Sequence, residues 1–243
     1  MPPIREGILD LRKARDTSSG WVSPAPVSLV DWVLAILPAL VYAVVSSSRI
    51  GRFVYNLDEG VNLVLATRLL HGEAPLDQFF YHQPPLYLYV LRELIRWGGD
   101  PVHAARLGSI LATAATGVLV YAAARRFTGR GGALFAAIVF FLCPLQFFNL
   151  AAMPNAWMLL FGTLGVYLAL FDRRRWAVVA GAAALVVAMA LKPLAISTGL
   201  ATGFLILLLP RWRGRRLAFV LAAGGASALA WLGFEWLLSL IHI

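Results

Sequence analysis

Charged side chains are the scarcest class in this sequence. Asp, Glu, Lys and Arg make up 14 % of the 243 residues, against about 25 % in an ordinary globular domain. Hydrophobic residues make up 60 %, and the mean hydropathy is +0.76. Several apolar runs approach the ~20 residues that a helix needs to cross a bilayer. This composition excludes an ordinary soluble fold and predicts an all-α, polytopic membrane protein.

Cysteine is nearly absent. Cys143 is the single cysteine and lies in an apolar run, so no disulfide can form within the chain and a packed thiol is expected. The polar segment 1–26 is too long to resemble the start of a cleaved signal peptide, and the apolar run after it has no clear cleavage site. We therefore expect residues 1–26 to form a cytoplasmic N-terminal segment and residues 27–243 to form one transmembrane module.

Seven apolar runs are predicted to be membrane spans. They lie at residues 27–48, 104–127, 131–148, 154–171, 176–191, 195–209 and 217–238. Most of the 21 Lys and Arg residues fall in the segments that are cytoplasmic if the N-terminus is inside, which is the usual bias of membrane proteins. Because these cations form short clusters at the ends of apolar runs, the net charge of +9 indicates topology and not nucleic-acid binding.

The long connection at residues 49–103 is then extracytoplasmic. Its segment 58–70 places Val61, Val64, Leu65 and Leu69 at spacings of three and four, on one face, which predicts an amphipathic helix on the membrane surface. A second such helix is expected over residues 86–97, because Pro84-Pro85 precedes it and Gly98-Gly99 follows it.

The same connection contains the most informative motif, the acidic sequence Asn56-Leu57-Asp58-Glu59-Gly60, which is followed by Tyr81-His82-Gln83-Pro84-Pro85. Two adjacent carboxylates at a membrane surface have two interpretations. Asn56 or Asp58 can cap the helix that follows, where an acceptor satisfies free N–H groups. Alternatively, the carboxylates take part in chemistry.

The order of the motifs distinguishes these interpretations. The acidic pair follows the first span, Arg68, Asp77 and the aromatic run 79–81 come next, Ala104-Ala105-Arg106-Leu107 opens the second span, and Leu191-Lys192-Pro193 ends the fifth. This order resembles the GT-C membrane glycosyltransferases of the dolichyl-phosphate-mannose protein mannosyltransferase type, including bacterial enzymes that move aminoarabinose or other sugars from polyprenyl phosphate. The resemblance covers residues 27–200.

The resemblance implies a function and a location. It implies a GT-C-like helical bundle that transfers a sugar from a polyprenyl-phosphate donor to a lipid, glycan or protein acceptor. The reaction would take place on the extracytoplasmic face of a bacterial-type inner membrane, with membrane lipids as partners and no nucleic acid. No cofactor is expected with certainty, and a divalent metal ion is left open.

The resemblance also implies site residues. Asp58 is the expected general base, and Glu59 is its partner or contacts a metal ion or the acceptor. The expected contacts to the donor phosphate or substrate are Arg68, His82, Gln83, Arg106, Asn155 and Lys192. Each has a plainer interpretation: a solvated or headgroup-bound arginine, a turn residue before the prolines, or a lysine that extends to the membrane interface.

The sequence departs from the family pattern at two of these positions. Asn155 stands where relatives carry an acid near a Met-Pro pair, and an amide cannot take a proton. Gln83 stands where many relatives carry lysine before the Pro-Pro pair. Relatives also continue through further spans into an outer domain. The resemblance therefore implies that the sequence corresponds to an N-terminal half and that this chain alone is poorly active.

Two functions of other classes remain open from the sequence. A transporter or flippase of lipid-linked sugars would line its path with Asp58, Glu59 and Lys192, although transporters tend to place such charges near the bilayer midplane. A non-catalytic membrane scaffold would tolerate substitution throughout the loop around Asp58.

Overall fold

The computed structural model describes residues 28–52, 56–73, 78–79, 81, 83–143, 146, 150–172, 174–208, 214 and 218–225. Every regular element defined in these ranges is a helix. The elements are α2 (Leu29–Ser47), η1 (Ile50–Arg52), α3 (Leu57–Leu70), α4 (Leu86–Gly98), α5 (Pro101–Ala124), α6 (Arg130–Leu142), α8 (Pro154–Phe171), α9 (Arg175–Leu191), η2 (Pro193–Ala195) and α10 (Ile196–Leu208). The all-α prediction is therefore confirmed for this part of the chain.

Three of the predicted spans are helices long and apolar enough to cross a membrane, namely α2, α5 and α8. The shortest of them, α8, has 18 residues, which at 1.5 Å per residue gives about 27 Å, close to the ~30 Å hydrocarbon core. The shorter apolar helices are 130–142, 176–191 and 193–208. That these also span, and that the N-terminus is cytoplasmic, stay predictions. The segment 1–26 and most of the predicted seventh span lie outside the described residues.

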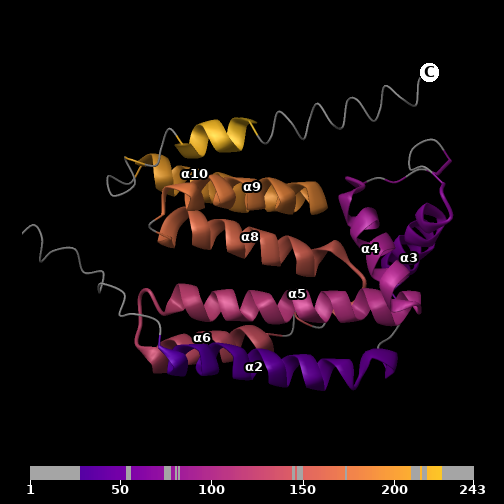
Figure 1. Cartoon of the computed structure of the whole chain (residues 1–243), viewed down its shortest axis with the longest axis horizontal. Helices are drawn as coiled ribbons and strands as arrows, with labels where there is room; N and C mark the ends of the chain where they lie inside the picture. The colour runs from indigo at the N-terminus through magenta and orange to yellow at the C-terminus, as the bar shows by residue number, and fades with distance from the viewer. Residues whose placement is uncertain are drawn as a thin grey trace, which may run out of the picture.

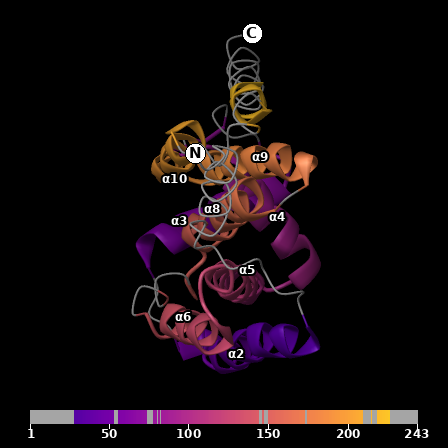
Figure 2. The same cartoon turned by 90° about the vertical axis from the view of Figure 1, so that its left-hand side faces the viewer.

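The helices form a layered stack (Figure 1). Helix α5 runs through the middle, with α2 and α6 on one side and α8, α9 and α10 on the other, and the view turned by 90° shows the same order (Figure 2). Helices α3 and α4 lie across one end of the stack. A buried apolar cluster joins them to α5 and to the end of α9, with Tyr87, Leu91, Ala105 and Leu191 among its members. The connection 49–103 therefore folds back onto the bundle.

The helix ends follow the local sequence. Ser28 and Asp31 form a capping box at the start of α2, and Asp100 caps α5 ahead of Pro101. Helix α4 begins after Pro85 and ends at Gly98. Its C-cap is Gly99, whose φ of 76° is unfavourable for other residues. Both helices predicted in the connection 49–103 are therefore present, within one residue of their predicted bounds.

Glycine allows α8 and α9 to approach closely. A Cβ atom on Gly165 would lie 2.9 Å from the carbonyl oxygen of Gly181, and one on Gly181 would lie 2.7 Å from the backbone nitrogen of Ala169. Such contacts are tighter than side chains permit. The glycine- and alanine-rich runs of the sequence thus serve the close helix packing expected of membrane bundles.

A charged cluster ties α2, α5 and α6 together at the end opposite α3 and α4. The carboxylate of Asp31 lies 3.0 Å from Nε of Arg125 and 3.2 Å from Nε of Arg130, and the hydroxyl of Tyr121 donates to it at 3.2 Å. The ion pairs of Arg125 and Arg130 therefore lie at the end of the stack opposite α3, the helix that begins with the acidic motif (Figure 1). Which of these ends faces the cytoplasm stays a prediction.

Helix α3 divides its apolar residues between two sides. Leu65 and Leu69 are buried, whereas Val61 and Val64, predicted to share a face with them, are exposed. The side of α3 that packs on the protein also holds Glu59 and Asn62, which are both buried. The prediction of a single apolar face is therefore wrong. The buried side of α3 carries polar as well as apolar side chains, and two of its valines are exposed.

Candidate active site

The carboxylate of Asp58 is free at the start of α3. Asn56 is the N-cap residue, and its side-chain oxygen accepts the backbone N–H of Asp58 at 3.0 Å. The capping interpretation therefore applies to Asn56 and not to Asp58. The Asp58 side chain is exposed, and no hydrogen bond or ion pair joins its carboxylate to any part of the chain that the structure describes. Asp58 is thus an acid whose oxygens are available for a ligand.

The neighbouring Glu59 has the opposite environment. Its side chain is fully buried and forms a two-pronged ion pair with Arg106 of α5, with Nε to Oε1 and Nη2 to Oε2 both at 2.7 Å. The backbone N–H of Ala152 donates to Oε1 at 2.9 Å, and Nη1 of Arg106 donates to the carbonyl oxygen of Ile50 at 2.6 Å. One buried ion pair therefore joins α3, α5, η1 and the segment before α8.

The ion pair determines the charge of Glu59. Burial raises the pKa of this carboxyl, but the hydrogen bonds from Arg106 and from the N–H of Ala152 outweigh burial and leave the pKa below its usual value. Glu59 is therefore ionised at neutral pH. All the nitrogens of the Arg106 guanidinium donate to protein oxygens, so this arginine faces inward and not toward a donor phosphate.

Two polar residues outside the predicted set of site residues complete this buried network. The amide nitrogen of Asn62 donates to the carbonyl oxygen of Ala152 at 3.3 Å, and the hydroxyl of Tyr81 donates to the amide oxygen of Asn62 at 3.1 Å. Burial raises the pKa of Tyr81 to about 12, so it remains a neutral donor. The spacing of Glu59 and Asn62, three residues apart on a helix, was the available signal that they share a face.

A second predicted pair meets where α9 ends and α8 begins. Nζ of Lys192 donates to the amide oxygen of Asn155 at 2.6 Å, and both side chains are half-buried. Asn155 is the second residue of α8, directly after Pro154, and Lys192 is the C-cap of α9. Since an ammonium group has three donors, this bond leaves Lys192 able to contact a further acceptor.

Arg68 stabilises the loop after α3. Its Nε donates to Glu73 at 2.6 Å, its Nη2 donates to the carbonyl oxygen of Gln78 at 3.2 Å, and its guanidinium lies 5.1 Å from the ring centre of Phe79. These contacts give it a structural role in addition to the predicted one. Gln83 is half-buried, and His82 and Asp77 lie outside the described residues.

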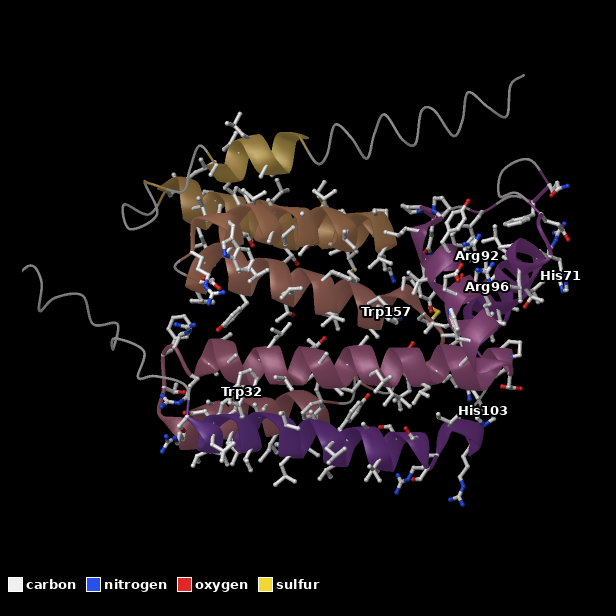
Figure 3. All side chains as sticks on the ribbon, in the orientation of Figure 1. Trp32, His71, Arg92, Arg96, His103 and Trp157 are labelled. Carbon is white, nitrogen blue, oxygen red and sulfur yellow. The ribbon has the colours of Figure 1, made fainter. Side chains whose placement is uncertain are left out.

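The end of the bundle around the acidic motif carries many basic side chains. Arg92 and Arg96 of α4 lie there, as do His71 and His103, whereas Trp32 lies toward the other end (Figure 3). Arg92 and Arg96 share Glu93, at 2.5 and 3.1 Å. Among the residues that the structure describes, no group of three or more His, Cys, Asp or Glu side chains lies close enough to hold a metal ion.

The structure therefore brings four of the predicted site residues together as two pairs. Glu59 contacts Arg106, and Asn155 contacts Lys192. Ala152, which donates its N–H to Glu59, precedes Asn155 by three residues, so the two pairs belong to one connected region. Asp58 is next to Glu59 in the chain, and Arg68 lies three turns along α3.

The sequence was also compared with known proteins. A family model described as dolichyl-phosphate-mannose-protein mannosyltransferase matches residues 82–235. This segment includes five of the predicted site residues, namely His82, Gln83, Arg106, Asn155 and Lys192, whereas Asp58, Glu59 and Arg68 precede it. No curated protein and no solved structure matches the chain. The match covers well over half of the sequence, and the chain therefore belongs to the dolichyl-phosphate-mannose-protein mannosyltransferase family of GT-C membrane glycosyltransferases.

Proposed function

We propose that this protein transfers a sugar from a polyprenyl-phosphate donor to an acceptor hydroxyl, with Asp58 as general base. The observation that carries the proposal is the contrast between two adjacent acids. Glu59 is locked in a buried ion pair, and Asp58 is exposed with its carboxylate free. A site that must bind an acceptor needs one such unoccupied carboxylate, held on a rigid element.

The reaction needs little from the protein beyond this base and positive charge. The acceptor oxygen attacks the anomeric carbon, its proton passes to the carboxylate of Asp58, and the bond from the anomeric carbon to the phosphate oxygen breaks. The polyprenyl phosphate leaves with the electron pair of that bond. A cation near the departing phosphate stabilises the developing negative charge.

Lys192 is the proposed cation. It has donors left after its bond to Asn155, whereas the guanidinium of Arg106 is occupied by Glu59 and Ile50. Arg106 and Glu59 are accordingly positioning residues that fix the start of α3. Asn155 orients Lys192, while Arg68, His82 and Gln83 remain proposed contacts at the outer side of the donor.

The proposed location follows from the topology. Helix α3, which begins with the acidic motif, lies at the end of the stack opposite the ion pairs of Arg125 and Arg130, and these arginines are cytoplasmic in the predicted orientation. The reaction would then occur on the extracytoplasmic face of a bacterial-type inner membrane, where a donor with a long prenyl chain can reach Asp58 from within the bilayer. The acceptor is a hydroxyl of a lipid, glycan or protein.

The donor class can be tested directly. Membranes containing this chain would be supplied with radiolabelled sugars carried either on polyprenyl phosphate or on nucleoside diphosphates, and the labelled products separated from the donors. We expect transfer from at least one polyprenyl-phosphate sugar and none from the nucleotide sugars. Transfer from a nucleotide sugar alone would contradict the proposal. Movement of the lipid-linked sugar across the membrane without transfer would favour a transporter.

Replacing Lys192 by methionine is expected to lower kcat/KM for the donor by about 10- to 100-fold. The estimate follows from the ~1.5–3 kcal/mol that a hydrogen bond to a charged group contributes, at ~1.4 kcal/mol per tenfold change. The measurement is the dependence of the transfer rate on donor concentration. The control is Arg96→Gln, which removes an exposed cation of α4 at the same end of the bundle. Equal small effects of the two substitutions would remove Lys192 from the site.

A further inference from the structure

A groove lies between α2 and α6, on the side of α5 that faces away from α8 and α9. Its volume is about 580 Å³. Leu37 and Val41 of α2 and Leu134 and Ile138 of α6 form its apolar walls, and Ser46 and Arg49 lie at one end. Between the walls the rings of Tyr42 and Phe141 stack with their centres 4.9 Å apart, so the two helices are held at this spacing.

The length of the groove corresponds to one leaflet of a bilayer. From Leu37 to Arg49 the chain advances twelve residues, about 18 Å at 1.5 Å per residue. Half of the hydrocarbon core of a bilayer is ~15 Å. The apolar part of the groove is therefore long enough to reach from near the middle of a membrane to its surface. Arg49 follows the end of α2 that lies on the side of α3 and α4 (Figure 1), which in the predicted topology is the level of the lipid headgroups.

The charge at the end of the groove points to an anionic ligand. Arg49 is exposed, and no ion pair joins it to an acid within the described ranges. In the predicted orientation it lies on the extracytoplasmic side, next to the end of α2. A guanidinium suits a phosphate group through paired hydrogen bonds. An apolar groove that ends at such a cation has the character of a lipid site.

From these observations we propose that the groove between α2 and α6 binds one anionic phospholipid, with an acyl chain along Val41 and Ile138 and its phosphate at Arg49. The site is separate from the proposed transferase site. Lys192 and Asn155 belong to α8 and α9, and α5 lies between those helices and the groove (Figures 1 and 2). The polyprenyl-phosphate donor would thus bind on the other side of α5.

The test is lipid binding by the full chain in detergent, measured by native mass spectrometry with phosphatidylglycerol and phosphatidylcholine of the same chain length. We expect phosphatidylglycerol to bind about fivefold more tightly, the effect of one cation next to an anionic lipid, and Arg49→Gln to remove this preference. Ile138→Trp, which places a large ring in the groove, should weaken binding of both lipids. The matched control is Arg52→Gln, a neighbouring exposed cation that does not line the groove.

Cys143 provides a second measurement, because it lines the groove and is the single cysteine of the chain. Phosphatidylglycerol should slow its alkylation severalfold in the unmodified protein and not in Arg49→Gln.

An unchanged lipid preference in Arg49→Gln would overturn the proposal. So would displacement of phosphatidylglycerol by equimolar polyprenyl phosphate, which would assign the groove to the donor, or efficient cross-linking of two chains through Cys143, which would assign it to a second copy. None of these readouts depends on sugar transfer.

Discussion

Replacing Asp58 by asparagine is expected to lower the rate of sugar transfer by about 10²–10⁴-fold, the usual contribution of a positioned general base. The substitution keeps the size and polarity of the side chain and removes only its ability to take a proton. Because Asn56 and not Asp58 caps α3, the helix should keep its start. The measurement is the single-turnover rate with a saturating donor, together with a separate assay of donor binding, which should change little.

The matched control for this experiment is Asp100→Asn. Asp100 is exposed at the same end of the bundle, and its carboxylate accepts the backbone N–H of His103 at 2.7 Å as the N-cap of α5. Asparagine caps helices as well as aspartate does, so this variant should retain both its fold and its activity. Comparable activity in the two variants would show that Asp58 is not the base.

Replacing Arg106 by methionine is expected to destabilise the protein by roughly 3–5 kcal/mol, because it leaves the carboxylate of Glu59 buried and unpaired. The pair is among the most buried polar groups of the structure, with side-chain exposures of 3 % and 0 %. The double variant Glu59→Gln with Arg106→Met removes both charges and should recover much of this loss. The free energy of unfolding would be measured by denaturant titration in mixed micelles.

The control for the buried pair is the partly exposed pair of Arg68 and Glu73, whose side chains are 38 % and 34 % exposed. Arg68→Met should cost about 1–2 kcal/mol, the sum of a pair in contact with water and the hydrogen bond to Gln78. If Arg106→Met costs no more than Arg68→Met, the buried pair does not hold α3 in place. The contrast between the two arginines therefore tests burial and not charge alone.

The buried pair also has a pH dependence with a definite sign. The pKa of Glu59 is lower in the folded protein than its usual value, so the stability that the pair contributes is present above the unfolded pKa of ~4.3. It is lost as the pH falls through the lower folded pKa. Stability of the unmodified protein should thus decline in acid, and the double variant should show less of this decline.

The helices were largely predictable from the sequence because hydrophobic runs and turn residues mark their bounds. Pro154 and Phe171 were predicted as the ends of one span, and they are the ends of α8. The run predicted at 131–148 was the least accurate, since α6 ends at Leu142 with Cys143 in extended conformation. Hydropathy alone reports burial in lipid or protein, whereas the local signal for the helix end is Pro144, because proline disfavours the helical conformation at the residue before it.

The site was predictable in its residues and less so in their roles. Adjacent positions on a helix differ by about 100°, so one acid of the pair had to face a different environment from the other. The sequence did not reveal which acid faces inward, because the answer depends on Arg106, 47 residues away in the chain. The same holds for Tyr81 and Asn62, whose bond depends on the path of the loop after α3.

The backbone of Ala152 contacts α3 twice, because its N–H donates to Glu59 and its carbonyl oxygen accepts from Asn62. These two hydrogen bonds couple the backbone entering α8 to the first turns of α3. Under the proposed function, this connection would hold the start of α3, which carries the base, next to the start of α8, where Asn155 binds Lys192. Such a site would accept sugars of a limited range of sizes, and a change of sugar preference would require substitutions that alter the distance between the starts of α3 and α8.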